Sequence, residues 1–118
     1  MPSERGLSKS ERITRKFEYD SVISHRNVRA GEYFKAYFLI DSGIERKAGF
    51  IAGKKVGSAV ARNRARRLLK ESYRRIKPEL ADRGFKVVFV AAPPIGEAGA
   101  ADVEAEMRRI LKRMGLLD

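Results

Sequence analysis

The sequence contains no cysteine. Disulfide bonds and thiolate metal sites are therefore excluded, and folding does not depend on the redox state of the compartment. Long apolar segments are also lacking, because runs such as residues 87–92 are far too short to cross a bilayer. The first residues, MPSERGLSKSERITRK, are basic but have no apolar stretch of the kind that a signal peptide needs. We therefore expect a cytoplasmic protein with no membrane partner.

Groups that could catalyse phosphodiester hydrolysis are scarce. A protein nuclease usually needs clustered carboxylates that hold metal ions, or histidines that act as acid and base. The single histidine, His25, lies in a predicted turn, and acidic residues such as Asp20, Glu32, Asp41 and Glu79 are scattered along the chain. We therefore expect neither a catalytic residue nor a metal ligand in the protein.

Positive charge dominates what is present. The chain has 118 residues, of which 43% are hydrophobic, enough for one modest core. Its 26 Lys and Arg residues face 15 Asp and Glu residues, which leaves a net charge of +11. This excess is the electrostatic footprint of a polyanion binder, and nucleic acid is the partner we expect.

The periodicity of the apolar residues predicts six elements. They are a helix from Thr14, as N-cap, to about Ser24, strands over residues 33–40 and 47–55, a helix over 59–77, a strand over 85–92, and a last helix that Asp102 caps. Turn residues at 41–43 favour antiparallel pairing of the first two strands. Residues 1–10 are polar and lack periodicity, so we expect a flexible basic arm. The sum is a single α+β domain over residues 1–118.

The helix over residues 59–77 separates its side chains into two faces. At about 100° per residue, an apolar arc gathers Ala61, Ala65, Leu68, Leu69, Ser72 and Ile76, with Tyr73 at its margin. The opposite arc holds Arg62, Asn63, Arg64, Arg66, Arg67, Lys70, Arg74 and Arg75, with Glu71 as its one acid. Between residues 54 and 77 there are ten cations and one acid, so +9 of the net +11 lies here. Because like charges four residues apart repel, this helix needs an anionic partner.

Several interpretations of the basic region compete. A surface helix that happens to be rich in arginine would need no ligand, but arginine outnumbers lysine and binds phosphate with two parallel hydrogen bonds, which favours structured RNA. Asn63 suits a base edge or sugar hydroxyl as well as a hydrogen bond to a nearby loop. The loop over residues 53–57 lacks the Walker spacing, yet its glycines favour contact of Lys54 and Lys55 with an RNA phosphate. A ribosomal protein and a DNA-binding regulator are the rival classes.

The segment GKKVGSAVARNRARRLLKE, residues 53–71, resembles the signature of the bacterial ribonuclease P protein subunit. The resemblance implies a two-layer α+β sandwich like the second domain of ribosomal protein S5, with a left-handed βαβ crossover that handedness rules alone would not suggest. It also implies that the protein assists a catalytic RNA subunit, which removes the 5′ leader from precursor tRNA. Mg²⁺ then belongs to the holoenzyme and is held mainly by RNA phosphates.

The same resemblance assigns roles to residues on two surfaces. It assigns contact with the RNA subunit to Arg62, Asn63, Arg64, Arg66, Arg67 and Lys70, and the loop lysines and the basic arc add Lys54, Lys55 and Arg74 to the RNA-binding set. A cleft for the single-stranded leader is formed by Tyr19, Ile23, Lys35, Tyr37 and Ile51. Family members often have an aromatic residue where Ile23 stands and a small polar residue where Ile51 stands. The alternative that Tyr19 and Ile23 only pack the first helix onto the sheet therefore stays open.

Overall fold

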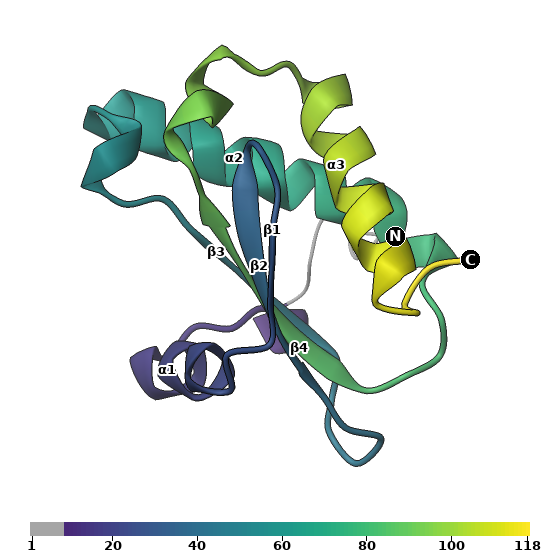
Figure 1. The fold of residues 1–118 in the computed structure, drawn as a ribbon. Helices are drawn as coiled ribbons and strands as arrows, with labels where there is room; N and C mark the ends of the chain where they lie inside the picture. The colour runs from purple at the N-terminus through teal and green to yellow at the C-terminus, as the bar shows by residue number, and fades with distance from the viewer. Residues whose placement is uncertain (1–8) are drawn as a thin grey trace.

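Four strands form one sheet in the order β1-β2-β4-β3, and helices cover it (Figure 1). The structure, a computed structural model, describes residues 9–118, so most of the predicted arm lies outside the described residues. The elements are η2 (Lys9–Glu11), α1 (Lys16–Ser24), β1 (Val28–Ala30), β2 (Phe34–Ile40), β3 (Lys47–Ile51), η3 (Lys54–Val56), α2 (Ala59–Ile76), η4 (Lys77–Glu79), β4 (Phe85–Ala91), η5 (Pro93–Glu97) and α3 (Ala100–Arg113). The predicted α+β class is confirmed.

The pairing of the strands corrects one prediction. β2 pairs antiparallel with β1 and with β4, whereas β3 pairs parallel with β4 and does not neighbour β2. The predicted antiparallel pairing of the second strand with the first is therefore wrong. The cause is tertiary, because α2 leads the chain back to place β4 between them and completes a β3-α2-β4 unit. The left-handedness of this crossover stays a prediction.

Two apolar layers lie on opposite faces of the sheet. The predicted alternation of β2 is confirmed, since Phe34, Ala36 and Phe38 are fully buried beneath α2 and α3. The other face carries a smaller core of Ile13, Val22 and Val88 beneath α1. Figure 1 shows the same arrangement, with α2 and α3 on one side of the sheet and α1 on the other.

Aromatic rings fix α2 to the sheet. Tyr73 of α2 lies 5.9 Å from Phe89 and 6.1 Å from Phe50 between ring centroids, and Phe50 stacks on Phe89 at 5.8 Å. The buried residues of α2 are Ala65, Leu69, Ser72, Tyr73 and Ile76, while the predicted Ala61 and Leu68 are half-buried. The buried arc is thus turned slightly toward Tyr73, which the sequence placed only at its margin.

The ends of the helices agree with the predictions for α2 and differ for the other two. Ser58 caps α2 by accepting a hydrogen bond from the Ala61 amide at 3.2 Å. Thr14 does not cap α1, since Arg15 holds the N-cap position without a side-chain bond. α3 begins before Asp102, whose carboxylate accepts from the Gly99 amide at 3.0 Å and so caps the helix from its first turn.

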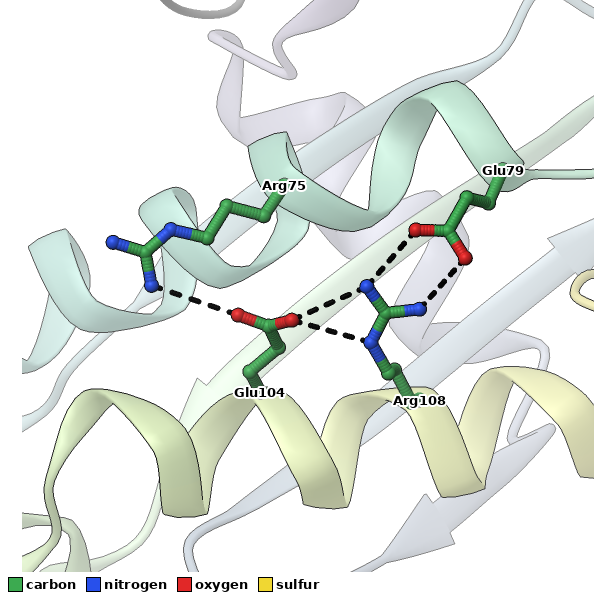
Figure 2. Close-up of polar contacts among 4 residues, drawn as sticks. All are labelled: Arg75, Glu79, Glu104 and Arg108. Carbon is green, nitrogen blue, oxygen red and sulfur yellow. Dashed lines mark hydrogen bonds and ion pairs between the residues drawn. The ribbon is translucent and has the colours of Figure 1, made fainter.

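Ion pairs hold α3 beside α2 and η4 (Figure 2). The Arg108 guanidinium donates to both oxygens of Glu79, at 2.9 and 3.0 Å, and to Glu104 at 3.2 Å. Glu104 also pairs with Arg75 of α2 at 3.5 Å. The hydrogen bonds from Arg108 hold the pKa of Glu79 below its ordinary value. Arg75 therefore has an acidic partner, whereas the other arginines of α2 form no ion pair within residues 9–118.

A buried carboxylate joins α3 to the turn between β1 and β2. Glu106 is 2% exposed and accepts hydrogen bonds from the amides of Glu32 and Tyr33 at 2.8 and 2.9 Å. Gly31 makes room for it, because a Cβ at that position would lie 2.3 Å from the carboxylate. Burial of this charge is therefore matched by hydrogen bonds.

No helix in residues 9–118 is long and apolar enough to span a membrane.

Candidate nucleic-acid interface

One side of α2 and the edge strand β3 enclose a basic groove. It is lined by Phe50, Asn63, Arg66, Arg67, Lys70, Glu71 and Arg74, and we refer to it as the arginine groove. Five residues of the predicted α2 set therefore come together at the edge of the sheet, namely Asn63, Arg66, Arg67, Lys70 and Arg74, whereas Arg62 and Arg64 do not line the groove. Phe50, which was not among the predicted residues, also lines it. Arg62 lies on the same helix, half-exposed.

The cations of this groove lack acidic partners within the described part of the chain. Arg66, Arg67, Lys70 and Arg74 form no ion pair there, in contrast to Arg75 with Glu104. Arg66 instead donates to the side-chain oxygen of Asn63. Residues 66, 70 and 74 are spaced by four, so their charges repel one another along one ridge. An anion in the groove would remove that repulsion.

Arg64 behaves differently from its neighbours. Its guanidinium turns toward η5 and donates to the carbonyl oxygens of Ala98 at 2.9 Å and Ile95 at 3.4 Å. Its side chain is thus held by the protein itself.

The predicted leader cleft is divided between two grooves. Tyr19, Ile23 and Ile51 line the first, which we call the α1 groove, together with Thr14, Lys16, Asp20, Phe50, Ala52 and Arg66. Phe50 and Arg66 line both this groove and the arginine groove, so the two surfaces are continuous around the edge of β3.

Lys35 and Tyr37 lie in the second groove, which we call the lysine groove. Its other lining residues are Gly53, Lys54, Lys55, Val56, Val90, Ala91, Ala92 and Pro93. The structure therefore places Lys54 and Lys55 beside Tyr37 and not in the arginine groove. Tyr37 also packs against the same small core as Tyr19, Ile23 and Ile51, so all four side chains share one face of the sheet.

Close packing fixes the wall of the α1 groove. The Tyr19 hydroxyl donates to the Ile13 carbonyl at 2.9 Å, and its ring lies where a Cβ on Gly49 would be 2.5 Å from Cε1. Burial raises the pKa of the Tyr19 phenol further above neutral pH. Tyr19 thus packs α1 onto the sheet, as the open alternative suggested, and also lines the groove.

A carboxylate ties α1 to two strands. Glu18 accepts from Lys47 at 3.3 Å and lies 3.5 Å from Lys86. Burial alone would raise the pKa of Glu18, but the hydrogen bond and charge of Lys47, with those of Lys86, outweigh it and lower the pKa.

In residues 9–118, no three His, Cys, Asp or Glu side chains come together where they could hold a metal ion.

An α+β fold with a groove of cations that have no acidic partner in residues 9–118, and with a further groove flanked by lysines, is typical of a small protein that binds nucleic acid. The ribonuclease P family model matches residues 7–115. The ribonuclease P protein component of Lactiplantibacillus plantarum is 34% identical over 114 residues, covering 95% of this chain and 98% of that protein. That of Dehalococcoides mccartyi is 37% identical over 109 residues, covering 92% and 84%.

Solved structures show the same fold. The RNase P protein of Staphylococcus aureus superposes with a TM-score of 0.79 at 20% identity, covering 93% of this chain and all of that one. The protein from Thermotoga maritima gives a TM-score of 0.75 at 23% identity, covering 87% and 96%. The chain belongs to the ribonuclease P protein family, whose members assist an RNA subunit in tRNA 5′ processing. This membership decides against a ribosomal protein and a DNA-binding regulator.

The attachment of α1 through Glu18 predicts a pH dependence. A carboxylate with a lowered pKa stabilises the folded state above its unfolded pKa, and this stabilisation is lost as pH falls through the lowered folded value. We expect Glu18→Gln to lower the free energy of unfolding by about 1 kcal/mol at pH 7, and by less as the pH falls below the ordinary pKa of a glutamate, as measured in urea at pH 7 and pH 3. Asp20→Asn is the control, because its pair with Lys16 is exposed and contributes little. An equal loss at both pH values would show that the charge of Glu18 does not hold α1.

Proposed function

We propose that this protein binds the catalytic RNA subunit of ribonuclease P through α2 and the 5′ leader of precursor tRNA in the two grooves beneath α1 and η3. It is in this way a subunit of a tRNA 5′-end endoribonuclease. The observation that carries the proposal is the ridge of α2 cations without acidic partners in the described chain, which faces an open groove at the sheet edge. A structured RNA offers the dense, rigid array of phosphates that such a ridge fits.

The arginine groove suits the RNA subunit. Arginine binds phosphate with two parallel hydrogen bonds and can also stack on a base, and each neutralised phosphate releases counterions. We assign this contact to Arg62, Asn63, Arg66, Arg67, Lys70 and Arg74. The side-chain amide of Asn63 keeps two donors for a base edge or sugar hydroxyl while its oxygen accepts from Arg66.

The α1 and lysine grooves suit a single strand. Unpaired bases need apolar or aromatic surface, and the phosphates between them need cations at the rim. Tyr37, Val56 and Val90 form the apolar part of the lysine groove, with Lys35, Lys54 and Lys55 around them. In the α1 groove, Ile23 and Ile51 offer aliphatic surface beside Tyr19. We therefore expect the leader to lie across this face of the sheet.

The chemistry of cleavage is assigned to the RNA. The scattered acids and the exposed His25 of the described chain do not fit a metal-dependent or acid–base protein site. Mg²⁺ coordinates phosphate and water oxygens readily, so we propose that the ions of the holoenzyme are held mainly by RNA. The protein contributes positive charge that lets two RNAs approach each other, in the cytoplasm where precursor tRNA is made.

Arg67→Ala tests the contact with the RNA subunit. Arg67 is exposed and has no partner in the described chain, so its removal should leave the fold intact. We expect the slope of log affinity against log salt to fall by about 0.7–0.9, the contribution of one phosphate contact. Arg75→Ala is the matched control on the same helix, because Arg75 is paired with Glu104, and it should leave the slope unchanged. Identical slopes for wild type and Arg67→Ala would contradict the assignment.

Tyr37→Ala tests the leader site. Loss of one stacked base costs ~1–3 kcal/mol, so affinity for precursor tRNA should fall about tenfold or more, while affinity for mature tRNA should not change. Tyr37→Phe keeps the ring and should bind like the wild type. Tyr33→Ala is a second control, since Tyr33 lines neither groove. If Tyr37→Ala weakens binding of mature and precursor tRNA alike, the leader does not lie over Tyr37.

A further inference from the structure

Arg64 stands in the middle of the basic signature, yet its guanidinium is directed into the protein. Two of its N–H groups reach the carbonyls of Ala98, the C-cap of η5, and of Ile95 within η5. A carbonyl at the end of a helical turn has no amide partner within that turn, so a cationic donor is well matched to the Ala98 oxygen, while the Ile95 oxygen also accepts from the Ala98 amide. The nearby Arg62, Arg67 and Lys70 make no comparable bond to the described chain.

The segment that Arg64 holds forms part of the lysine groove. η5 follows Ala92 and begins at Pro93, and both residues line that groove. On its other side η5 is anchored in the main core by Ile95 and Ala98, which are 0% and 3% exposed. The hydrogen bonds from Arg64 therefore join α2 to the segment that supplies one wall of the lysine groove.

η5 also packs against η3, the short turn that carries Lys54 and Lys55. Arg64 thus connects three segments in series, namely α2, η5 and η3. Hydrogen bonds join α2 to η5, and packing contacts join η5 to the turn that carries the two lysines. This arrangement gives Arg64 a role that its charge alone does not suggest.

We propose that Arg64 is a positioning residue, which holds η5 against α2 and so fixes the lysine groove for the leader of precursor tRNA. The proposal rests on the leader-binding function proposed for that groove. It separates Arg64 from Arg62 and Arg67, whose side chains make no hydrogen bond or ion pair within residues 9–118. The family signature then combines RNA contacts with one residue that shapes the substrate groove.

The test compares Arg64→Ala with Arg67→Ala in the full-length protein assembled with its RNA subunit. Hydrogen exchange at the Ala98 amide, which donates to the Ile95 carbonyl at 3.1 Å, should become about tenfold faster in Arg64→Ala and stay unchanged in Arg67→Ala. The preference of the holoenzyme for precursor over mature tRNA should fall severalfold in Arg64→Ala. The salt slope for the RNA subunit should fall only in Arg67→Ala.

Arg64→Lys provides a second variant that keeps the charge. A lysine cannot donate to both carbonyls from a planar fork, so exchange at Ala98 should still be faster than in the wild type, with an unchanged salt slope. The proposal is overturned if Arg64→Ala lowers the salt slope as Arg67→Ala does while exchange in η5 is unaltered. If the wild type itself shows no preference for precursor tRNA, the proposed leader site fails, and the exchange rates still decide whether Arg64 positions η5.

Discussion

Leu69, Tyr73 and Ile76 bury one face of α2 against the sheet, and this packing decides where every arginine of the helix lies. Full burial of each such side chain contributes roughly 1.5–3 kcal/mol, whereas each like-charged pair four residues apart costs only about 0.2–0.5 kcal/mol. The apolar face therefore prevails over the repulsion on the opposite face. α2 folds with its cations gathered on one side, and the unfavourable charge density there becomes favourable once RNA binds.

The edge strand β3 joins the arginine groove to the α1 groove. Phe50 stacks on Phe89 and contacts Tyr73, yet it also lines both the arginine groove and the α1 groove. Arg66 lines the same two grooves, so the surface proposed for the RNA subunit and the surface proposed for the leader are continuous. In the proposed arrangement, a protein of 118 residues contacts two RNAs at once, because the edge strand β3 lies between α2 and α1.

Local patterns in the sequence were sufficient for α2 and β2. The period of the apolar residues located α2, and strict alternation located the buried face of β2. β1 was not predicted, because the three residues of Val28–Ala30 are all exposed and show no apolar alternation. They form a strand through their pairing with β2. The parallel pairing of β3 with β4 could not be predicted from the sequence either. Paired residues such as Lys47 and Lys86 are 39 positions apart, and no local sequence pattern indicates that they pair.

The sequence indicated which residues belong to the candidate site, but not which of them lie together in one groove. The cations of α2 and the aromatic residues of the cleft were found, but the division of the cleft into two grooves depends on where η3 and η5 pack. Likewise, the bond from Arg64 to the Ala98 carbonyl joins residues 34 apart and makes a signature arginine an internal contact. Charge in a sequence shows that a segment binds an anion, and only the tertiary contacts show which side chains are free to do so.

Leader release by the reconstituted enzyme tests this account most directly. The RNA subunit is mixed with precursor tRNA at low Mg²⁺, where few ions are present to screen the repulsion between the two RNAs, with and without the protein. The account predicts that the protein speeds release of the 5′ leader at a single cleavage site, and that this advantage shrinks as Mg²⁺ is raised. Equal rates with and without the protein at low Mg²⁺ would contradict it.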